Sequence, residues 1–160
     1  MKQLGIILGV VVLIAAYFFF QIDWEARAIR GQFDQLVELV EKDGPVSQFE
    51  ALGRSRKLVG LFTEQPTIEY FPNRRLSRGA DAIGAAFLSA WSELDTASIY
   101  LLGHELEVDD DSVSARSKIT LRASIRMEGV EKMGDTLRYR VYWQKVDGTW
   151  RIRDLIALES

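Results

Sequence analysis

The sequence predicts an α+β fold, in which helices pack on a curved antiparallel sheet behind an apolar N-terminal segment. Residues 113–127 alternate apolar and polar side chains almost without interruption, which is the period of a strand with one buried face. Residues 23–94 carry apolar stripes at helical spacing, separated by turn residues. Residues 4–22 contain no charged side chain. These observations indicate one α+β domain preceded by one transmembrane helix.

Composition limits the chemistry available to the chain. Its 160 residues, 48% of them hydrophobic, are enough for one domain and a short extra segment. It has no cysteine, which excludes a thiolate nucleophile, a disulfide framework and a cysteine zinc site. Its single histidine excludes a multi-histidine metal site, and its formal charge of −3 gives no reason to expect nucleic acid. We therefore expect neither a metal nor a cofactor.

The N-terminal segment predicts a membrane anchor. As a helix, residues 4–22 would span roughly 28 Å, about the hydrocarbon thickness of a bilayer, and Trp24 follows where an interfacial aromatic side chain is expected. A cleaved signal peptide and a buried soluble helix are the alternatives, although the small-residue site Ala26-Arg27-Ala28 lies beyond two charged residues. We divide the chain into a signal anchor, residues 1–22, and a domain, residues 23–160. The short N-terminal tail favours a single-pass protein whose C-terminal domain is periplasmic or otherwise extracytoplasmic.

Three helices and a short strand are predicted before the sheet. The first helix covers residues 23–42 and ends before Gly44-Pro45. Gly31 is the only weak break near its join to the membrane helix, so one continuous rod is an alternative. The second covers residues 47–62 and begins with a capping box, in which Ser47 and Glu50 satisfy each other's backbone amides. A strand follows over residues 67–71 and a third helix over residues 80–94. The side chains expected on the core side of the second helix are Phe49, Leu52, Val59 and Phe62.

Residues 96–158 are predicted to form a long antiparallel meander. A four-residue loop at 109–112 sets His104 opposite Ser117. Asp147-Gly148 is a strong hairpin signal and sets Val141 opposite Asp154. These registers give the sheet an inner face of apolar and aromatic side chains and an outer face that is rich in arginine.

Two polar side chains interrupt the inner face, and they are its candidate catalytic residues. His104 and Asp154 would form a general acid–base pair in an apolar pocket. The alternative is structural, with Asp154 bonded to a backbone amide or an arginine and His104 bonded to Ser117 or a carbonyl. The same face carries aromatic side chains that would line a pocket or simply fill the core: Tyr70, Trp91, Tyr100, Tyr139 and Trp143.

The outer face is the more unusual surface of the predicted sheet. Its cations, in an acidic protein, predict a docking surface for an acidic partner, a second copy of the chain or anionic lipid headgroups. A solvated strand surface that discourages aggregation is the alternative. Tyr142 is the only aromatic side chain interleaved with the cations, which argues against nucleic acid. The cations of this face are Arg116, Lys118, Arg122, Arg126, Arg138, Arg140, Arg151 and Arg153. Those predicted to contact a partner are Arg116, Arg122, Arg138, Arg140, Arg151 and Arg153.

The order of these elements resembles the NTF2-like superfamily, which includes SnoaL-like and ketosteroid-isomerase-like proteins. The resemblance is carried by Leu76-x-x-Gly79, residues 108–115 and residues 147–152, and it covers residues 23–159. It implies an NTF2-like cone of three helices on a curved sheet, with an apolar pocket and often a dimer across the sheet. The first helix lacks the tyrosine of the isomerase-type site, whereas His104 and Asp154 loosely match the dehydratase-type His/Asp arrangement.

We expect a non-catalytic, membrane-anchored component of an envelope complex, because the layout is similar to that of membrane-anchored superfamily members in secretion systems. It would bind a protein partner or a small apolar ligand. One alternative is a pocket enzyme, an isomerase, dehydratase or hydrolase acting through Asp154 and His104. The other is a structural module that forms a homodimer.

Overall fold

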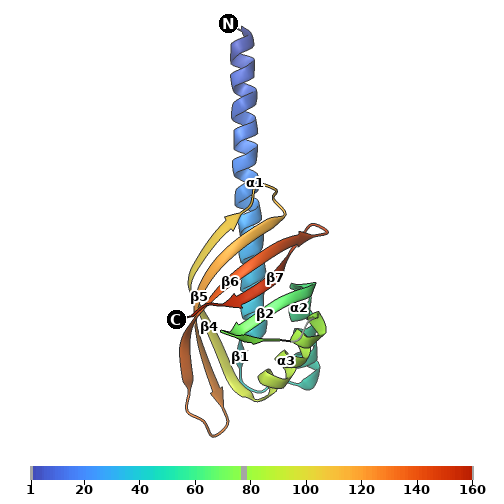
Figure 1. Ribbon diagram of the computed structural model, residues 1–160, viewed down its shortest axis with the longest axis vertical. Helices are drawn as coiled ribbons and strands as arrows, with labels where there is room; N and C mark the ends of the chain where they lie inside the picture. The colour runs from blue at the N-terminus through green and yellow to red at the C-terminus, as the bar shows by residue number, and fades with distance from the viewer. Residues whose placement is uncertain (1, 77–78, 160) are drawn as a thin grey trace.

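The computed structural model describes residues 2–76 and 79–159, and within these ranges the side chains of residues 2–9 and 18–23 lie outside the description. Three helices and a seven-stranded sheet make up the described chain (Figure 1). The helices are α1 (Lys2–Val40), α2 (Gln48–Val59) and α3 (Ala80–Ser92). The strands are β1 (Lys42–Asp43), β2 (Phe62–Phe71), β3 (Arg74–Arg75), β4 (Leu94–Val108), β5 (Ser114–Met127), β6 (Met133–Val146) and β7 (Thr149–Ala157). The predicted α+β class is confirmed.

Helix α1 joins the N-terminal segment to the domain without a break. Its first half extends beyond the sheet as a rod, and its second half runs along the sheet (Figure 1). Ile29 and Phe33 in the second half are 0% and 2% exposed. The helix expected over residues 23–42 is therefore the end of a longer helix, because its one weak breaker, Gly31, is exposed and tolerated there.

The predicted membrane anchor falls mostly on residues whose side chains lie outside the description, residues 4–9 and 18–22. Within the described part of the chain, no helix has the length and apolar character needed to cross a bilayer.

The sheet has the strand order β1-β4-β5-β6-β7-β2-β3. Neighbouring strands are antiparallel except for β2 and β7, which are parallel, so the expectation of a purely antiparallel sheet is wrong at this pair. The connection from β2 to β7 contains α3 and the strands β4, β5 and β6, and a connection of this length permits parallel pairing. β2 also begins earlier than the strand expected over residues 67–71, because Phe62 already pairs with Ile152.

The core lies between α1 and the inner face of the sheet. Removal of apolar surface from water, at roughly 25 cal/mol per Å², is the main force that holds the helix against the strands. The core extends under α2, α3 and β2 through Leu58, Ile83 and Ile68. Its largest fully buried side chains are Trp143, Ile29, Ile119, Ile152 and Val141.

Helix α2 turns a different side to the core from the one expected. Phe49 is 87% exposed and Leu52 is 41% exposed, whereas Ser55 is buried. Ser55 Oγ donates to Gly84 O of α3 at 3.2 Å, and a Cβ at Gly84 would lie 3.1 Å from this hydroxyl. α2 therefore packs through a small polar contact with α3, and the predicted core role of Phe49 and Leu52 is wrong. The N-cap is confirmed in part, since Ser47 Oγ accepts from Glu50 N at 3.1 Å.

The loop between β4 and β5 is longer than predicted, and this changes the pairing of the two strands. His104 pairs with Ile119 instead of Ser117, a shift of two positions. The turn is held by Asp111, whose carboxylate accepts from the amides of Val113 and Ser114 at 2.9 and 3.0 Å. A shift by an even number leaves every side chain on its predicted face, so His104 stays on the inner face.

A bulge in β4 reverses the faces in the first half of that strand. The register shifts between Leu101 and Gly103, and before this point Tyr100 pairs with Arg122. An extra residue in one strand inverts the alternation on its far side. Tyr100 therefore lies on the outer face, 64% exposed, and its predicted inner position is wrong.

The hairpin between β6 and β7 forms at Asp147-Gly148 as predicted, with φ of 50° and 79° at its two residues. Lys145 pairs with Trp150, as expected from this turn. Further along, the register shifts between Tyr142 and Trp143, so that Asp154 pairs with Tyr142. The predicted pairing of Asp154 with Val141 is wrong, because the bulge in β7 moves Asp154 to the outer face.

Candidate functional site

The inner face around His104 is closely packed. His104 Nε2 lies 2.9 Å from Ser117 Oγ, and Trp143 Nε1 donates to the same oxygen at 2.9 Å. Ser117 and Trp143 are 3% and 2% exposed. The Phe33 ring of α1 meets the imidazole edge-on, with centroids 5.5 Å apart and planes at 61°. Three neighbours thus occupy the space around the imidazole.

The surroundings of His104 favour a neutral ring. Burial lowers the pKa of His104 below its ordinary value, and the nearby Arg30 guanidinium lowers it further. Asp34, one turn further along α1, opposes this shift. A neutral imidazole next to a hydroxyl is suited to a structural hydrogen bond, with Nε2 already engaged by Ser117.

Asp154 does not meet His104. It lies on the outer face, where one carboxylate oxygen accepts from Arg153 Nε at 2.8 Å. The parallel neighbour of Asp154 on β2 is Thr67. Because the sheet separates the two side chains, the structure does not bring together the predicted acid–base pair. Of the two predicted roles, the arrangement matches the structural one, in which Asp154 bonds an arginine and His104 bonds Ser117.

The five predicted pocket aromatics are likewise not brought together. Trp143 is buried in the core, whereas Trp91 on α3 donates to Val40 O at the end of α1. Tyr100 is exposed on the outer face of the sheet. Tyr139 and Tyr70 do meet, since the Tyr139 hydroxyl donates to Tyr70 O at 3.2 Å, and burial raises the pKa of Tyr139. They border a cavity of about 50 Å³, enough for one or two water molecules and too small for an organic ligand.

The outer face has a shallow, charged hollow of about 430 Å³ over β4, β5 and β6. Lys118 and Arg140, which both line it, are direct cross-strand neighbours on β5 and β6. Neither cation has a carboxylate oxygen within 4.0 Å among the described residues. The residues that border the hollow are Glu105, Leu106, Glu107, Arg116, Ser117, Lys118, Arg140 and Tyr142.

The structure places all six predicted arginines on this face, but several have partners there. Arg116 pairs with Glu107 at 3.3 Å and Asp109 at 3.6 Å. Arg138 donates to Glu159 O at 3.2 Å. Arg153 lies over the Tyr142 ring, 5.4 Å from its centroid, besides its bond to Asp154. Arg122 is exposed, and Arg151 Nε is buried without an acceptor among the described residues.

With the fold and both faces of the sheet described, the family can be assigned. The family model of the SnoaL-like domain matches residues 51–156, two thirds of the chain. The chain belongs to the SnoaL-like family. No curated protein matches it.

Solved structures agree with this SnoaL-like assignment and with the predicted NTF2-like fold. A protein of Novosphingobium aromaticivorans named as a scytalone dehydratase has a TM-score of 0.74 and 17% identity, covering 89% of this chain and 88% of that one. An NTF2-like superfamily protein of Salmonella enterica has a TM-score of 0.68 and 13% identity, covering 85% and 91%. A protein of N. aromaticivorans named as an aromatic ring hydroxylase has a TM-score of 0.68 and 11% identity, covering 81% and 85%. At these identities the likeness shows the fold alone.

A buried ion pair that sequence reasoning missed joins α1 to the sheet of this SnoaL-like domain. Glu25 is 5% exposed, and its two carboxylate oxygens accept from Lys145 Nζ and Trp150 Nε1, each at 2.5 Å. The sequence did carry a signal, because Glu25 lies one helical turn before Ile29 and two before Phe33, on the stripe that faces the core. The contact fixes where the N-terminal rod leaves the domain.

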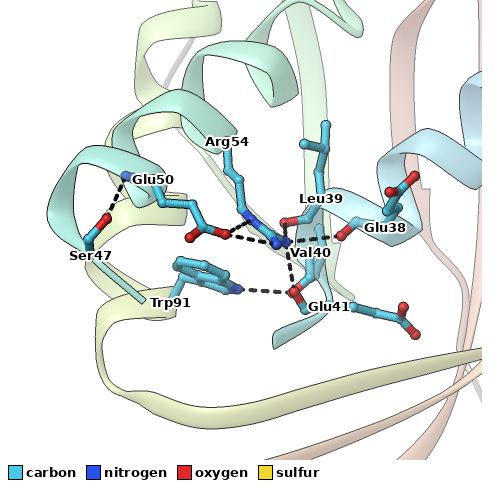
Figure 2. Close-up of polar contacts among 8 residues, drawn as sticks. All are labelled: Glu38, Leu39, Val40, Glu41, Ser47, Glu50, Arg54 and Trp91. Carbon is cyan, nitrogen blue, oxygen red and sulfur yellow. Dashed lines mark hydrogen bonds and ion pairs between the residues drawn. The ribbon is translucent and has the colours of Figure 1, made fainter. Parts of the chain in front are cut away.

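A second missed cluster holds the C-terminal end of α1 (Figure 2). Arg54 of α2 donates through Nη1 to Glu38 O at 3.2 Å and Glu41 O at 3.0 Å, while its guanidinium also binds Glu50 at 3.2 Å. Trp91 Nε1 of α3 donates to Val40 O at 3.0 Å. These donors satisfy carbonyls that a helix end leaves unpaired. Trp91 and Arg54 therefore cap the C-terminal end of α1 together.

The described residues offer no obvious metal site, since no three His, Cys, Asp or Glu side chains among them gather closely enough to hold an ion. What this SnoaL-like domain presents is a closed inner face and an open, cationic outer one. Hydrogen bonding and charge complementarity to an anionic surface are the chemistry that the outer face can supply.

Proposed function

We propose that the chain is a membrane-tethered, non-catalytic SnoaL-like domain that binds an acidic protein partner through its outer sheet face. The observation that carries the proposal is the pair Lys118 and Arg140. The two cations are cross-strand neighbours that line the hollow, and like charges in that position repel unless an anion joins them. An acidic side chain of a partner would supply that anion.

The state of the inner face supports a role without turnover. A general acid–base pair needs two titratable groups within reach of one substrate. Here Asp154 lies on the far side of the sheet, and the Nε2 atom of His104 is already bonded to Ser117. Ser117 Oγ holds both His104 Nε2 and Trp143 Nε1, and the outer face presents cations that have no such partner.

The continuity of α1 supports the membrane tether. From Val10 to Ile14 the described side chains are apolar and at least 48% exposed. Apolar surface in contact with water is unfavourable by roughly 25 cal/mol per Å², so this rod requires apolar surroundings. In the proposal residues 4–22 cross the bilayer, and the domain lies on the extracytoplasmic side.

The proposal is tested with the full-length chain in nanodiscs of uncharged lipid and a fluorescent peptide of ten glutamates. The double variant Lys118→Glu/Arg140→Glu should weaken binding at least tenfold. The matched control Arg56→Glu/Lys57→Glu removes the same charge from the exposed surface of α2 and should change binding less than twofold. Equal losses in the two variants, or no binding by the wild type, would contradict the proposal.

Anionic lipid is the competing occupant of the same face. Replacing the uncharged lipid with phosphatidylglycerol tests it, because headgroups that bind the outer face would compete with the peptide. An unchanged peptide affinity supports the protein partner. A loss of peptide affinity in phosphatidylglycerol that is seen in the wild type and not in Lys118→Glu/Arg140→Glu would assign the face to lipid.

A pocket enzyme is the second candidate, favoured by the likeness to the structure named as a scytalone dehydratase and by the half-buried His104. Its acid–base chemistry would rest on His104 without Asp154. Turnover of scytalone by the purified chain, lost in His104→Gln at unchanged stability, would establish this function and overturn the non-catalytic role.

A further inference from the structure

One border of the sheet is open along β4. The only strand on that side, β1, pairs with Thr96 and Ala97. Beyond it, residues 98–108 have no neighbouring strand on that side in the described chain, and Figure 1 shows β4 as the border strand there. An unpaired strand edge presents a row of free backbone donors and acceptors. A single edge amide, that of Ile99, is bonded to a side chain, Glu41 Oε1, at 3.2 Å.

The first half of this edge is apolar and exposed. Tyr100, Leu101 and Leu102 are 64%, 43% and 57% exposed, and residues 98–102 contain no charge and no proline. Exposed edges in soluble domains are usually protected by charged residues, proline or a covering element. The bulge at Leu101–Gly103 turns Tyr100 and Leu102 outward beside the unprotected backbone.

The second half of the edge is acidic. Glu105 and Glu107 are exposed on the outer side of the strand, and three aspartates follow them in the turn, residues 109–111. Arg116 offsets part of this charge through its contacts with Glu107 and Asp109. The open edge therefore changes from apolar to acidic along its length.

We propose that the free edge of β4 accepts an extended segment of a different protein, which adds a strand to the sheet. Its backbone would pair with residues 98–107. Its outward side chains would be apolar beside Tyr100 and Leu102 and basic beside Glu105 and Glu107. Backbone pairing supplies affinity in such strand addition, and the alternate side chains supply specificity. The acidic half of this edge borders the hollow through Glu105 and Glu107, but the edge takes a basic segment, whereas Lys118 and Arg140 take an acidic one.

A second copy of the chain fits the edge poorly. α1 runs antiparallel to β4, because Phe33 meets His104 whereas Glu41, further along α1, reaches Ile99. Antiparallel pairing of two β4 edges would point the two α1 rods in opposite directions, which excludes a shared bilayer if α1 is the tether proposed above. Parallel pairing would set the acidic half of each β4 beside the same acidic half of its copy.

The test uses the full-length chain in nanodiscs and a labelled peptide, Lys-Thr-Lys-Thr-Val-Thr-Val-Thr, blocked at both ends. In antiparallel pairing its lysines lie beside the acidic half and its valines beside the apolar half. The control peptide replaces both lysines with glutamate. Fluorescence anisotropy should show at least tenfold weaker binding of the control peptide. Leu102→Lys, a charge at an exposed edge position, should weaken the lysine peptide at least fivefold, whereas Lys57→Glu on α2 should change binding less than twofold.

Hydrogen exchange locates the binding. The lysine peptide should slow exchange of amides within residues 98–107 and leave α2 unchanged. Equal binding of both peptides, no binding, or protection elsewhere overturns the proposal. If the wild type is a dimer that Leu102→Lys dissociates, the edge binds a second copy of the chain. That result also overturns the proposal. These outcomes are distinct from failure of the proposed function, because none of the variants alters Lys118 or Arg140.

Discussion

The two faces of one sheet have opposite characters in this protein. On the inner face, His104 Nε2 and Trp143 Nε1 share one buried partner, Ser117 Oγ. On the outer face, Lys118 and Arg140 stand together with no carboxylate within 4.0 Å in the described chain. Water and salt screen the outer cations, whereas buried polar groups must find partners within the fold. His104, Ser117 and Trp143 therefore serve stability, whereas Lys118 and Arg140 can bind a partner.

The largest effect on the inner face is expected for Glu25. Glu25→Ala leaves Lys145 and Trp150 without their acceptor, and we expect a loss of about 2–4 kcal/mol in the free energy of unfolding. Urea denaturation followed by tryptophan fluorescence measures it. The double variant Glu25→Leu/Lys145→Leu should recover part of the loss, because an apolar pair replaces the ion pair while Trp150 Nε1 stays without its acceptor. A loss below about 0.5 kcal/mol in Glu25→Ala would show that the contact does not hold α1 to the sheet.

Ser117→Ala tests the shared hydroxyl. Trp143 Nε1 and His104 Nε2 lose their common partner in a buried setting, for which we expect about 1–3 kcal/mol. Ser89→Ala on the exposed side of α3 is the control and should cost less than about 0.5 kcal/mol. If both variants unfold at the same urea concentration, the inner face is less closely packed than the distances indicate.

The pH dependence of stability tests the setting of His104. Because burial lowers the pKa of His104 in the folded state, the folded protein prefers the neutral ring. The stabilisation is complete above the unfolded pKa, near 6.5, and is lost as the pH falls through the folded pKa. The stability of the wild type relative to His104→Gln should therefore fall between about pH 7 and pH 5. If the stability of the wild type relative to His104→Gln rises on acidification, the effect of Asp34 on the pKa of His104 outweighs the effects of burial and Arg30.

The smallest effect is expected for the outer face. Lys118→Glu/Arg140→Glu should change the free energy of unfolding by less than about 0.5 kcal/mol, because both side chains are exposed and unpaired. The same urea measurement checks it. A loss comparable to that of Ser117→Ala would give these cations a role in holding the fold and erase the contrast between the faces.

Much of the fold could be predicted because its patterns are local. The alternation over residues 113–127 predicted β5 within a residue at each end, and Asp147-Gly148 predicted its hairpin, since each depends on side chains a few positions apart. The positions of Tyr100 and Asp154 were missed because each lies next to a bulge that adds one residue to a strand. The bulge in β4 did have a signal, since Gly103 interrupts the strand pattern there. The bulge in β7 has no glycine or proline that marks it in the sequence.

The side chains of the candidate site show the same limit. The arginines of β5, β6 and β7 were predicted on the outer face by alternation alone. Which of them are paired depends on contacts between strands, such as Arg116 with Asp109 or Arg153 with Tyr142. The sequence predicts that Glu25 lies on the apolar stripe of its helix. It does not predict the partner of Glu25, Lys145, because that residue is 120 positions away.

The contrast between the faces is tested most directly by one binding measurement on two variants. The affinity of the nanodisc-bound chain for the ten-glutamate peptide is compared between Lys118→Glu/Arg140→Glu on the outer face and His104→Gln on the inner face. The account predicts at least a tenfold loss for the first variant and less than a twofold change for the second. A loss confined to His104→Gln, or equal in both, would contradict it.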